Sequence, residues 1–299
     1  MKIREVLQDA VKKFKDSNIT EPIIKARILL AHILDVSKEY LIIHSEEEIK
    51  GEDIERYNKV VTLVIKGKTL QYITNEQEFM KMKFYVDENV LIPRADTEIL
   101  VEEVINNCNK NVGKQCDILD LCAGSGAIGV SIAKYIKNSN VVCTDISANA
   151  LDIAKRNAKS NCIENIKFVQ SDMFKEIYDK FDIIVSNPPY IKKDVIPTLD
   201  KEVQNEPYIA LDGGEDGLDF YRIIFKHFDE IINDVNDERA QKFINYLYDI
   251  KKKNGKRLSE NTLYKPFSFV RKLFNYFKDD LKIIDYNGLW KSVLKGFYI

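Results

Sequence analysis

The sequence predicts an α/β protein in which a doubly wound, mostly parallel sheet follows a small helical domain. Strand and helix patterns alternate from residue 95 onward, which is typical of βαβ units. A glycine-rich turn separates the first long strand from its helix, and the first 71 residues show only helical periodicity. With 299 residues, the chain is long enough to form both parts.

Residues 1–71 are predicted to form a helical bundle. The stretches IREVLQDAVKKF, IKARILLAHIL and IERYNKVVTLVIKG place apolar residues three and four positions apart, as on one face of a helix. We expect Thr20 to cap the second helix and Glu21-Pro22 to form its first turn. Residues 72–94 alternate apolar and polar side chains in two short runs, which predicts a β-hairpin linker.

Residues 95–299 are predicted to form the sheet and the helices that cover it. Strands are expected at 116–122, 140–146, 166–172 and 181–187, and helices at 96–107, 127–137 and 149–161. Because strand and helix follow one another in succession, the strands should run parallel.

The composition argues against several classes of protein. Lys and Arg total 45 against 47 Asp and Glu, so the formal net charge of −2 provides no overall attraction to nucleic acid. The five cysteines include no C-x-x-C pair, so neither a disulfide framework nor a zinc site is expected. The N-terminus is charged and amphipathic, unlike a signal peptide, and no apolar run is as long as a membrane span. We therefore expect a cytoplasmic protein that does not bind a membrane.

The glycine-rich turn over 122–129 is the first motif that indicates chemistry. Gly124, Gly126 and Gly129 stand between a strand and a helix, where bare backbone lets a ligand lie at the helix N-terminus. Asp145 follows about 20 residues later at the end of the next strand, where a carboxylate can accept hydrogen bonds from a ribose. The spacing matches the dinucleotide motif G-x-G-x-x-G, which is weak evidence alone.

Two further carboxylates help to choose between a nicotinamide enzyme and an S-adenosylmethionine enzyme. Asp120 precedes the turn, where it could meet the ammonium group of a methionyl moiety, and Asp172 ends the third strand, where it could meet an adenine amino group. A carboxylate beside the turn would repel a pyrophosphate, which favours the methyl donor. The structural alternative is that both are solvated or capping carboxylates.

The stretch DIIVSNPPYI ends a buried strand on two consecutive prolines. Each proline removes a backbone donor and restricts the residue before it, so the chain leaves the sheet in a stiff, extended shape. Asn187 therefore has a rigid mount at the carboxyl end of a strand, where ligands of such sheets bind. The alternative is that Asn187 and Pro188 only terminate the strand.

Taken together, these motifs resemble a class I methyltransferase with a Rossmann-like sheet, and more narrowly the HemK/PrmC family of protein-(glutamine-N5) methyltransferases. The resemblance rests on LQYITNEQEF, NVLIPRADTEILVE, DLCAGSGAIGVSIA, IVSNPPYI and EPYIALDGGEDGLDFYRII, which cover roughly residues 70 to 225. It implies methyl transfer from S-adenosylmethionine, leaving S-adenosylhomocysteine and requiring no metal. It also implies that the substrate is a class I peptide chain release factor, methylated at its Gly-Gly-Gln loop and recognised by the N-terminal bundle. The resemblance further implies a monomer with no stable nucleic acid partner.

The resemblance also implies roles for particular residues. Asn187 and the Pro188 carbonyl would accept the two N–H bonds of the substrate amide, Tyr190 would pack on its plane, and Pro189 would complete the substrate site. Arg94 and Glu98 belong to a stretch that lies beside the cofactor in the family, and we expect them to support the residues that contact it. The cofactor would be bound by Asp120, Cys122, Ala123, Gly124, Ser125, Gly126, Asp145, Asp172, Met173 and Asn187.

The chain departs from the family in two places. Cys122 stands at a turn position that is commonly glycine, which narrows the room for the cofactor. Residues 233–279 are basic, aromatic and atypical, and they are either a divergent version of the family's sheet elements, the interpretation we favour, or a replaced segment. Residues 281–299 again resemble the terminal strand pair of the family.

Two other functions remain open at this point. Asn-Pro-Pro-Tyr also suits the exocyclic amine of adenine, as in an N6-adenine DNA or RNA methyltransferase. The near-neutral charge and the acidic stretch SEEEIKGEDIE of the N-terminal bundle argue against that substrate. The other alternative is a non-catalytic, methyltransferase-like binding protein.

Overall fold

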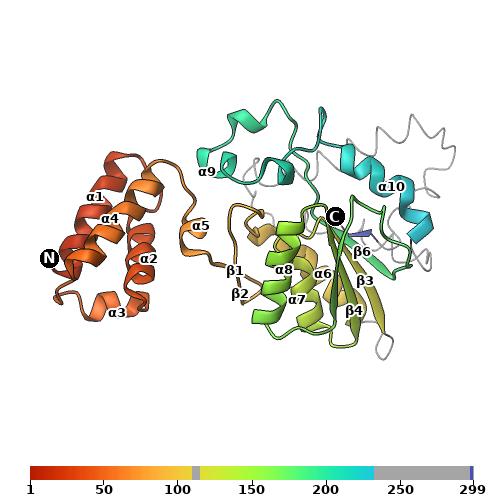
Figure 1. Ribbon diagram of the computed structural model, residues 1–299, viewed down its shortest axis with the longest axis horizontal. Coiled ribbons are helices and arrows are strands. Elements are labelled where there is room, and N and C mark those ends of the chain that lie inside the picture. The colour runs from red at the N-terminus through yellow and green to blue at the C-terminus, as the bar shows by residue number, and fades with distance from the viewer. Residues whose placement is uncertain (110–114, 232–296, 299) are drawn as a thin grey trace, which may run out of the picture.

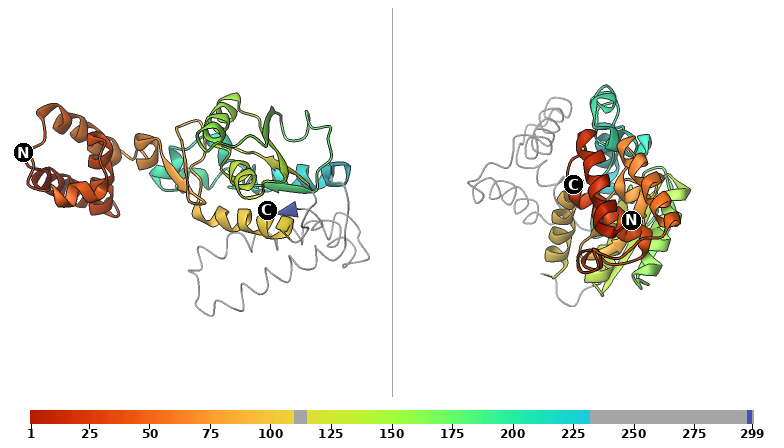
Figure 2. Two further views of the ribbon diagram at one scale, coloured as in Figure 1. Left: turned by 90° about the horizontal axis from the view of Figure 1, so that it is seen from below. Right: turned by 90° about the vertical axis from the view of Figure 1, so that its left-hand side faces the viewer.

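The computed structural model describes residues 1–109, 115–231 and 297–298. A helical bundle lies at one end of the molecule, and a sheet flanked by helices lies at the other (Figure 1). A short helix and a two-stranded hairpin connect them, and the left view of Figure 2 shows the bundle again at the opposite end of the molecule from the sheet. The predicted α/β fold class, with a helical N-terminal part, is confirmed.

The bundle contains the helices α1 (Ile3–Asp16), α2 (Pro22–Leu34), α3 (Lys38–Ile43) and α4 (Gly51–Ile65). Three of them, α1, α2 and α4, confirm the helices that the apolar periodicity predicts. Their apolar faces enclose a separate core in which side chains such as Tyr57 are fully buried.

The start of α2 differs from the prediction. Pro22 stands in its first turn as expected, but the capping position is Glu21 and not Thr20. Glu21 has a φ of 53°, and its side chain makes no capping hydrogen bond to the described backbone. The fixed φ of Pro22 starts the helix instead of a hydroxyl cap.

The hairpin is shorter than the predicted range 72–94. Residues up to Thr74 belong to α5 (Leu70–Thr74), which ends at Asn75 in the left-handed conformation. The hairpin itself comprises β1 (Gln77–Phe79) and β2 (Met82–Phe84), which pair antiparallel. The alternating pattern that predicted a longer hairpin continues into residues that run past α8 without forming strands.

The sheet contains parallel strands in the order β5-β4-β3-β6-β7 within the described residues. These are β3 (Cys116–Leu121), β4 (Ser139–Asp145), β5 (Ile166–Gln170), β6 (Ile183–Ser186) and β7 (Phe297–Tyr298). From β3 the chain proceeds outward through β4 and β5, and then returns to place β6 on the other side of β3. This reversal creates a switch point at the carboxyl end of β3.

Helices cover both faces of the sheet (Figure 1). The helices α6 (Glu98–Asn109), α7 (Ala127–Tyr135) and α8 (Ala148–Ser160) pack side by side on one face, and α10 (Asp219–Ile231) lies on the other. Alternate residues of β3 point to the two faces. Ile118 belongs to the core under α6, α7 and α8, and the side chain that follows it in the strand belongs to the core under α10.

Three short elements lie between β6 and α10. They are the 3₁₀ turns η2 (Ile196–Thr198) and η3 (Tyr208–Ala210), with α9 (Lys201–Gln204) between them. A further 3₁₀ turn, η1 (Ala95–Thr97), precedes α6. Of these elements, η1 and η3 contribute residues to the cavity at the carboxyl ends of the strands.

The atypical segment 233–279 lies outside the described residues, so the two interpretations of it stay predictions of the sequence. Of the terminal strand pair expected in 281–299, the described part is β7, which pairs parallel with β6. Within the described residues, no helix combines the length and the apolar character that a membrane span needs.

Candidate active site at the switch point of the sheet

A cavity of about 200 Å³ opens at the carboxyl ends of β3, β4, β5 and β6. The segments that follow these strands line it, from Cys122, Asp145, Ser171 and Asn187 onward. Linker residues, η3 and single residues of β1, η1 and α10 also contribute to its wall. The cavity therefore lies at the switch point, where a sheet of this topology binds its ligand.

The glycine-rich turn after β3 uses its glycines in different ways. At Gly124 (φ 54°) an added Cβ would meet no atom within 4 Å, so a ligand can approach this backbone. At Gly126 (φ 76°) a Cβ would lie 2.8 Å from the Cβ of Ala154, so this glycine allows the turn to pack on α8. A Cβ at Gly129 would lie 3.0 Å from Oδ2 of Asp120. Only the first of these glycines faces the cavity.

Asp145 ends β4 and holds the glycine-rich turn in place. Its Oδ2 accepts the Gly124 N–H at 2.8 Å, and its Oδ1 accepts the Ser147 N–H at 2.9 Å. Burial raises the pKa of this carboxyl, although the two backbone hydrogen bonds act in the opposite direction. Asp145 also lines the cavity, and each carboxylate oxygen can accept a further hydrogen bond from a ligand hydroxyl.

Asp120 lies beneath the glycine-rich turn, and its expected contact with a ligand stays a prediction. Its side chain is fully buried, its Oδ2 accepts the Gly129 N–H at 2.9 Å, and it is absent from the cavity lining. Burial raises its pKa to about 7. Its Oδ1 is buried and has no hydrogen-bond partner within the described residues. The carboxyl group therefore faces the first turn of α7.

Cys122 has a backbone conformation that favours glycine. Its φ is 58°, in the left-handed region that is unfavourable for side chains with a Cβ. Its Sγ lies 3.8 Å from Sδ of Met173, and both residues line the cavity. Burial raises the pKa of the thiol, so it stays protonated at neutral pH.

Asp172 occupies the cavity edge after β5. It is exposed, and its Oδ2 lies 2.5 Å from Nζ of Lys175. Asp172 therefore agrees with both alternatives from the sequence: it lines the cavity, where a ligand could meet it, and it is also a solvated carboxylate.

Asn187 follows β6 directly and lines the cavity. Pro188 and Pro189 behind it are buried, whereas Tyr190 is 48% exposed. The hydroxyl of Ser186 donates to the Leu121 carbonyl at 2.8 Å and anchors the end of β6 to β3. The side chain of Asn187 makes no hydrogen bond to the described residues, so its amide group is available to a ligand.

A loop after η3 braces the backbone that follows Asn187. The Ile191 N–H donates to the Leu211 carbonyl at 3.0 Å, and the Gly213 N–H donates to the Ile191 carbonyl at 2.8 Å. A Cβ at Gly213 would lie 2.7 Å from the Cα of Tyr190. Glycine is therefore required for this close approach of two backbone segments.

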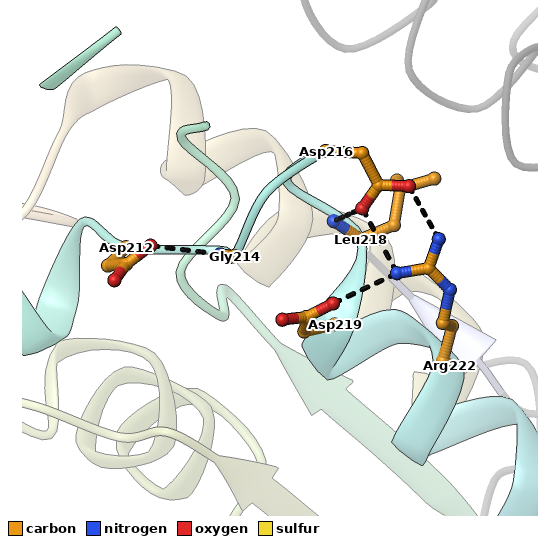
Figure 3. Close-up of polar contacts among 6 residues, drawn as sticks. All are labelled: Asp212, Gly214, Asp216, Leu218, Asp219 and Arg222. Carbon is orange, nitrogen blue, oxygen red and sulfur yellow. Dashed lines mark hydrogen bonds and ion pairs between the residues drawn. The ribbon is translucent and has the colours of Figure 1, made fainter. Parts of the chain in front are cut away.

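Acidic side chains shape this loop and tie it to α10 (Figure 3). Asp212 accepts the Gly214 N–H at 2.9 Å, and Asp216 accepts the Leu218 N–H at 3.1 Å. Asp216 also pairs with the guanidinium of Arg222 at 2.5 Å, and this hydrogen bond holds the pKa of Asp216 below its usual value. The stretch EPYIALDGGEDGL thus supports the Asn-Pro-Pro-Tyr segment without lining most of the cavity.

Arg94 and Glu206 connect the linker to this part of the chain. Arg94 lines the cavity and forms an ion pair with Glu206, whose side chain is 1% exposed. Oε2 of Glu206 also accepts the Ile92 N–H at 3.2 Å. Burial raises the pKa of Glu206, and Arg94 partly offsets that effect. The geometry agrees with a supporting role for Arg94 and adds Glu206 as its partner.

Glu98 supports the turn of the hairpin, and its expected role beside the cofactor stays a prediction. Its Oε1 accepts the Met80 N–H at 2.6 Å, and the hydroxyl of Tyr135 donates to the Met80 carbonyl at 2.7 Å. Met80 and Lys81 form the two-residue turn of the hairpin with φ values of 50° and 58°. Such a turn normally needs glycine or asparagine, and these two side-chain contacts hold it in their absence.

Asn157 is a supporting residue that the sequence analysis missed. Its Oδ1 accepts the Tyr85 N–H at 2.7 Å, and its Nδ2 donates to the carbonyls of Tyr85 and Ser125 at 3.0 and 2.9 Å. It therefore joins the linker to the glycine-rich turn. The available signal was a polar residue on the apolar face of the helix, one turn after Ala154.

Most of the predicted site residues meet at the cavity. Those that line it are Arg94, Cys122, Ala123, Gly124, Ser125, Asp145, Asp172, Met173, Asn187 and Pro189. Those outside the lining are Glu98, Asp120, Gly126, Pro188 and Tyr190. Lining residues that the sequence analysis did not identify include Phe79, Asn89, Val90, Leu91, Ile146, Ser147 and Ile209.

Three family models match the chain. The methyltransferase small domain matches residues 95–204, and the PrmC N-terminal domain matches residues 5–74. The phage integrase SAM-like domain matches residues 214–289. This third match includes the atypical segment 233–279.

Two bacterial relatives are similar over most of the chain. The release factor glutamine methyltransferase of Clostridium acetobutylicum is 43% identical over 229 residues, which are 75% of this chain and 80% of the relative. That of Clostridium botulinum is 38% identical over 240 residues, which are 78% of this chain and 84% of the relative. Together with a methyltransferase domain and a PrmC N-terminal domain, this similarity shows that the chain belongs to the family of release factor glutamine methyltransferases.

Proposed function

We propose that this protein transfers a methyl group from S-adenosylmethionine to the side-chain amide nitrogen (N5) of a glutamine in the Gly-Gly-Gln loop of class I peptide chain release factors. The observation that carries the proposal is the place of Asn187. Its amide group lies at the cavity wall on a buried Pro-Pro mount, with no partner within the described residues. The names of the relatives supply the substrate class.

The described residues fit the proposed cofactor. Gly124 offers open backbone, and Asp145 presents a carboxylate to the cavity for a ribose hydroxyl. Cys122, Met173 and Ile146 supply apolar wall, and Asp172 is an acceptor at its edge. When bound, S-adenosylmethionine supplies an electrophilic methyl group on its sulfonium sulfur, and S-adenosylhomocysteine remains after transfer.

The protein contributes orientation. A glutamine nitrogen shares its lone pair with the carbonyl, so it is a poor nucleophile, and a general base would help little before the new bond forms. The Asn187 side-chain oxygen and the Pro188 carbonyl accept the two amide N–H bonds, which aims the nitrogen at the methyl group and stabilises its developing positive charge. The exposed ring of Tyr190 packs on the plane of the amide, and the proton leaves to water afterwards.

The partner and the location follow from the same proposal. A protein loop is the substrate, the enzyme acts as a monomer in the cytoplasm, and no metal, membrane or stable nucleic acid complex takes part. The net charge of −2 suits a protein substrate better than a duplex. The N6-adenine alternative is not favoured, since the relatives are named for release factor glutamine.

The test is a methyl-transfer assay with labelled S-adenosylmethionine. Three acceptors are compared: a release factor, the same factor with its Gly-Gly-Gln glutamine replaced by alanine, and duplex DNA or ribosomal RNA. We expect label on the first acceptor alone. Label on nucleic acid alone would overturn the proposal, and calorimetry that shows no binding of S-adenosylmethionine would favour the non-catalytic alternative.

A further inference from the structure

We propose that α9 ties the N-terminal bundle to the methyl-transfer site, and that the Lys25–Glu202 ion pair of this tie is needed for efficient methylation of an intact protein but not of a short peptide. The inference rests on the proposed function for its substrate. Figure 1 shows α9 between the bundle and the sheet, near α5. The single turn of α9 and the two residues that follow it contact the bundle on one side and the cavity wall on the other.

The contact to the bundle is an ion pair with a buried cation. Nζ of Lys25, on α2, lies 2.7 Å from Oε1 of Glu202 on α9, and Lys25 is only 9% exposed. The hydroxyl of Thr69 donates to the Glu202 carbonyl at 3.2 Å. A buried lysine needs its partner, because an unpaired ammonium would lose its hydration without compensation.

A glycine allows the backbones to come close at the same place. Nδ2 of Asn205 donates to the Gly67 carbonyl at 2.7 Å. Gly67 has a φ of 95°, and a Cβ there would lie 3.3 Å from the Cβ of Lys201. The segment that ends α4 thus packs closely against α9, in addition to the ion pair between α2 and α9.

The other end of this segment reaches the cavity. Glu206 directly follows Asn205 and holds Arg94, which lines the cavity, and the Ile92 N–H. Glu202 and Glu206 therefore attach to opposite sides within five residues of chain. A shift of the bundle would move α9, and with it the ion pair at the cavity wall.

The tie matters because the bundle has a core of its own, separate from the core of the sheet. Parts of a chain joined by a linker move relative to each other unless a sufficient interface fixes them. A release factor that contacts both the bundle and the cavity needs them at a constant separation. A peptide that occupies only the cavity does not need this constant separation. Comparing the two substrates therefore distinguishes an effect on the position of the bundle from an effect on the methyl-transfer step.

The experiment compares Lys25→Met with the wild-type protein. Methionine keeps the apolar stem of the lysine and removes its charge. The matched control is Lys155→Met, which removes an exposed ion pair within α8. The charge-exchanged double variant Lys25→Glu with Glu202→Lys tests whether a restored pair rescues the effect. We measure kcat/KM on an intact release factor and on a Gly-Gly-Gln peptide, S-adenosylmethionine affinity, and hydrogen exchange of the Gly67 and Asn205 amides.

We expect Lys25→Met to lower kcat/KM for the intact protein about tenfold, the effect of losing roughly 1.4 kcal/mol, and to leave peptide methylation and cofactor affinity within about twofold. The Gly67 and Asn205 amides should exchange faster, and the double variant should recover both properties. Equal losses on both substrates, or no loss, would overturn the inference while the proposed function stands. If the wild-type protein methylates neither substrate, the proposed function fails, and unchanged amide exchange in Lys25→Met then overturns the tie by itself.

Discussion

Glu206 holds Arg94 at the cavity wall across 112 positions of sequence, and the same carboxylate accepts the Ile92 N–H. The glutamate is 5% exposed, so the linker and the segment after α9 meet at a buried acidic side chain. This contact places a cation beside the cavity without exposing its partner to the ligand.

Replacing Glu206 separates its two interactions. Glu206→Gln keeps an acceptor for the Ile92 N–H and loses the ion pair, so the free energy of unfolding should fall by less than about 1.5 kcal/mol. Glu206→Ala leaves the N–H without an acceptor and should cost about 1–3 kcal/mol. Both variants should have a lower rate of methyl transfer, because Arg94 at the cavity wall loses its ion-pair partner. Urea unfolding and kcat/KM check these outcomes, with Glu176→Gln at an exposed site as control, and an unaltered kcat/KM in Glu206→Gln would restrict the pair to a structural role.

Asp120 should make stability depend on pH. Its folded pKa of about 7 lies above the ordinary value of about 3.9, so between these values the folded protein binds more protons than the unfolded chain. The free energy of unfolding should therefore decline as pH rises from about 4 to 7, with a contribution of up to about 1.4 kcal/mol per pH unit from this group. Asp120→Asn should show a shallower decline in urea unfolding across that range. Identical pH profiles for the two proteins would contradict this assignment.

The alternation of strand and helix patterns predicted the sheet, because each buried strand is an apolar run and each covering helix has an apolar face. The same alternation predicts the direction of the Asp120 side chain. Since Ile118 belongs to the core under α6, α7 and α8, the side chain two positions later points to that face as well, where Oδ2 of Asp120 accepts the Gly129 N–H.

Other features could not be read from local patterns. The left-handed φ of Cys122 is set by the turn that its glycines require, although cysteine does not favour it. The contacts of Glu206 and Asn157 join segments far apart in the chain, and a single sequence carries no signal for which distant backbone groups a buried polar side chain will meet. The predicted hairpin is longer than the observed one because apolar and polar residues continue to alternate beyond β2. There the chain lies against α8 and not against a partner strand.

Asp145→Ala should weaken cofactor binding more than it weakens the fold. The substitution removes the proposed ribose acceptor and leaves the Gly124 N–H without its partner, so the turn also loses its fixed position. We expect the affinity for S-adenosylmethionine to fall about 10- to 100-fold, corresponding to roughly 1.5–3 kcal/mol. Titration calorimetry measures the affinity and thermal unfolding measures the fold, with the exposed Asp152→Asn as control. Unchanged affinity would remove Asp145 from the site.

Asn187→Ala should leave cofactor binding within a few fold and reduce methyl transfer by at least about 100-fold. Because Asn187 acts on the amide nitrogen, whose charge changes only on the way to the transition state, its hydrogen bond strengthens there, and such a contact is worth about 2.7–4 kcal/mol. Asn187→Asp keeps an acceptor at similar volume, so it should retain more activity than the alanine variant. Single-turnover methyl transfer and cofactor titration give the two quantities separately. If Asn187 only ended β6, the alanine variant would instead keep full turnover and melt at a lower temperature, and the rigid Pro188-Pro189 mount would then serve the sheet alone.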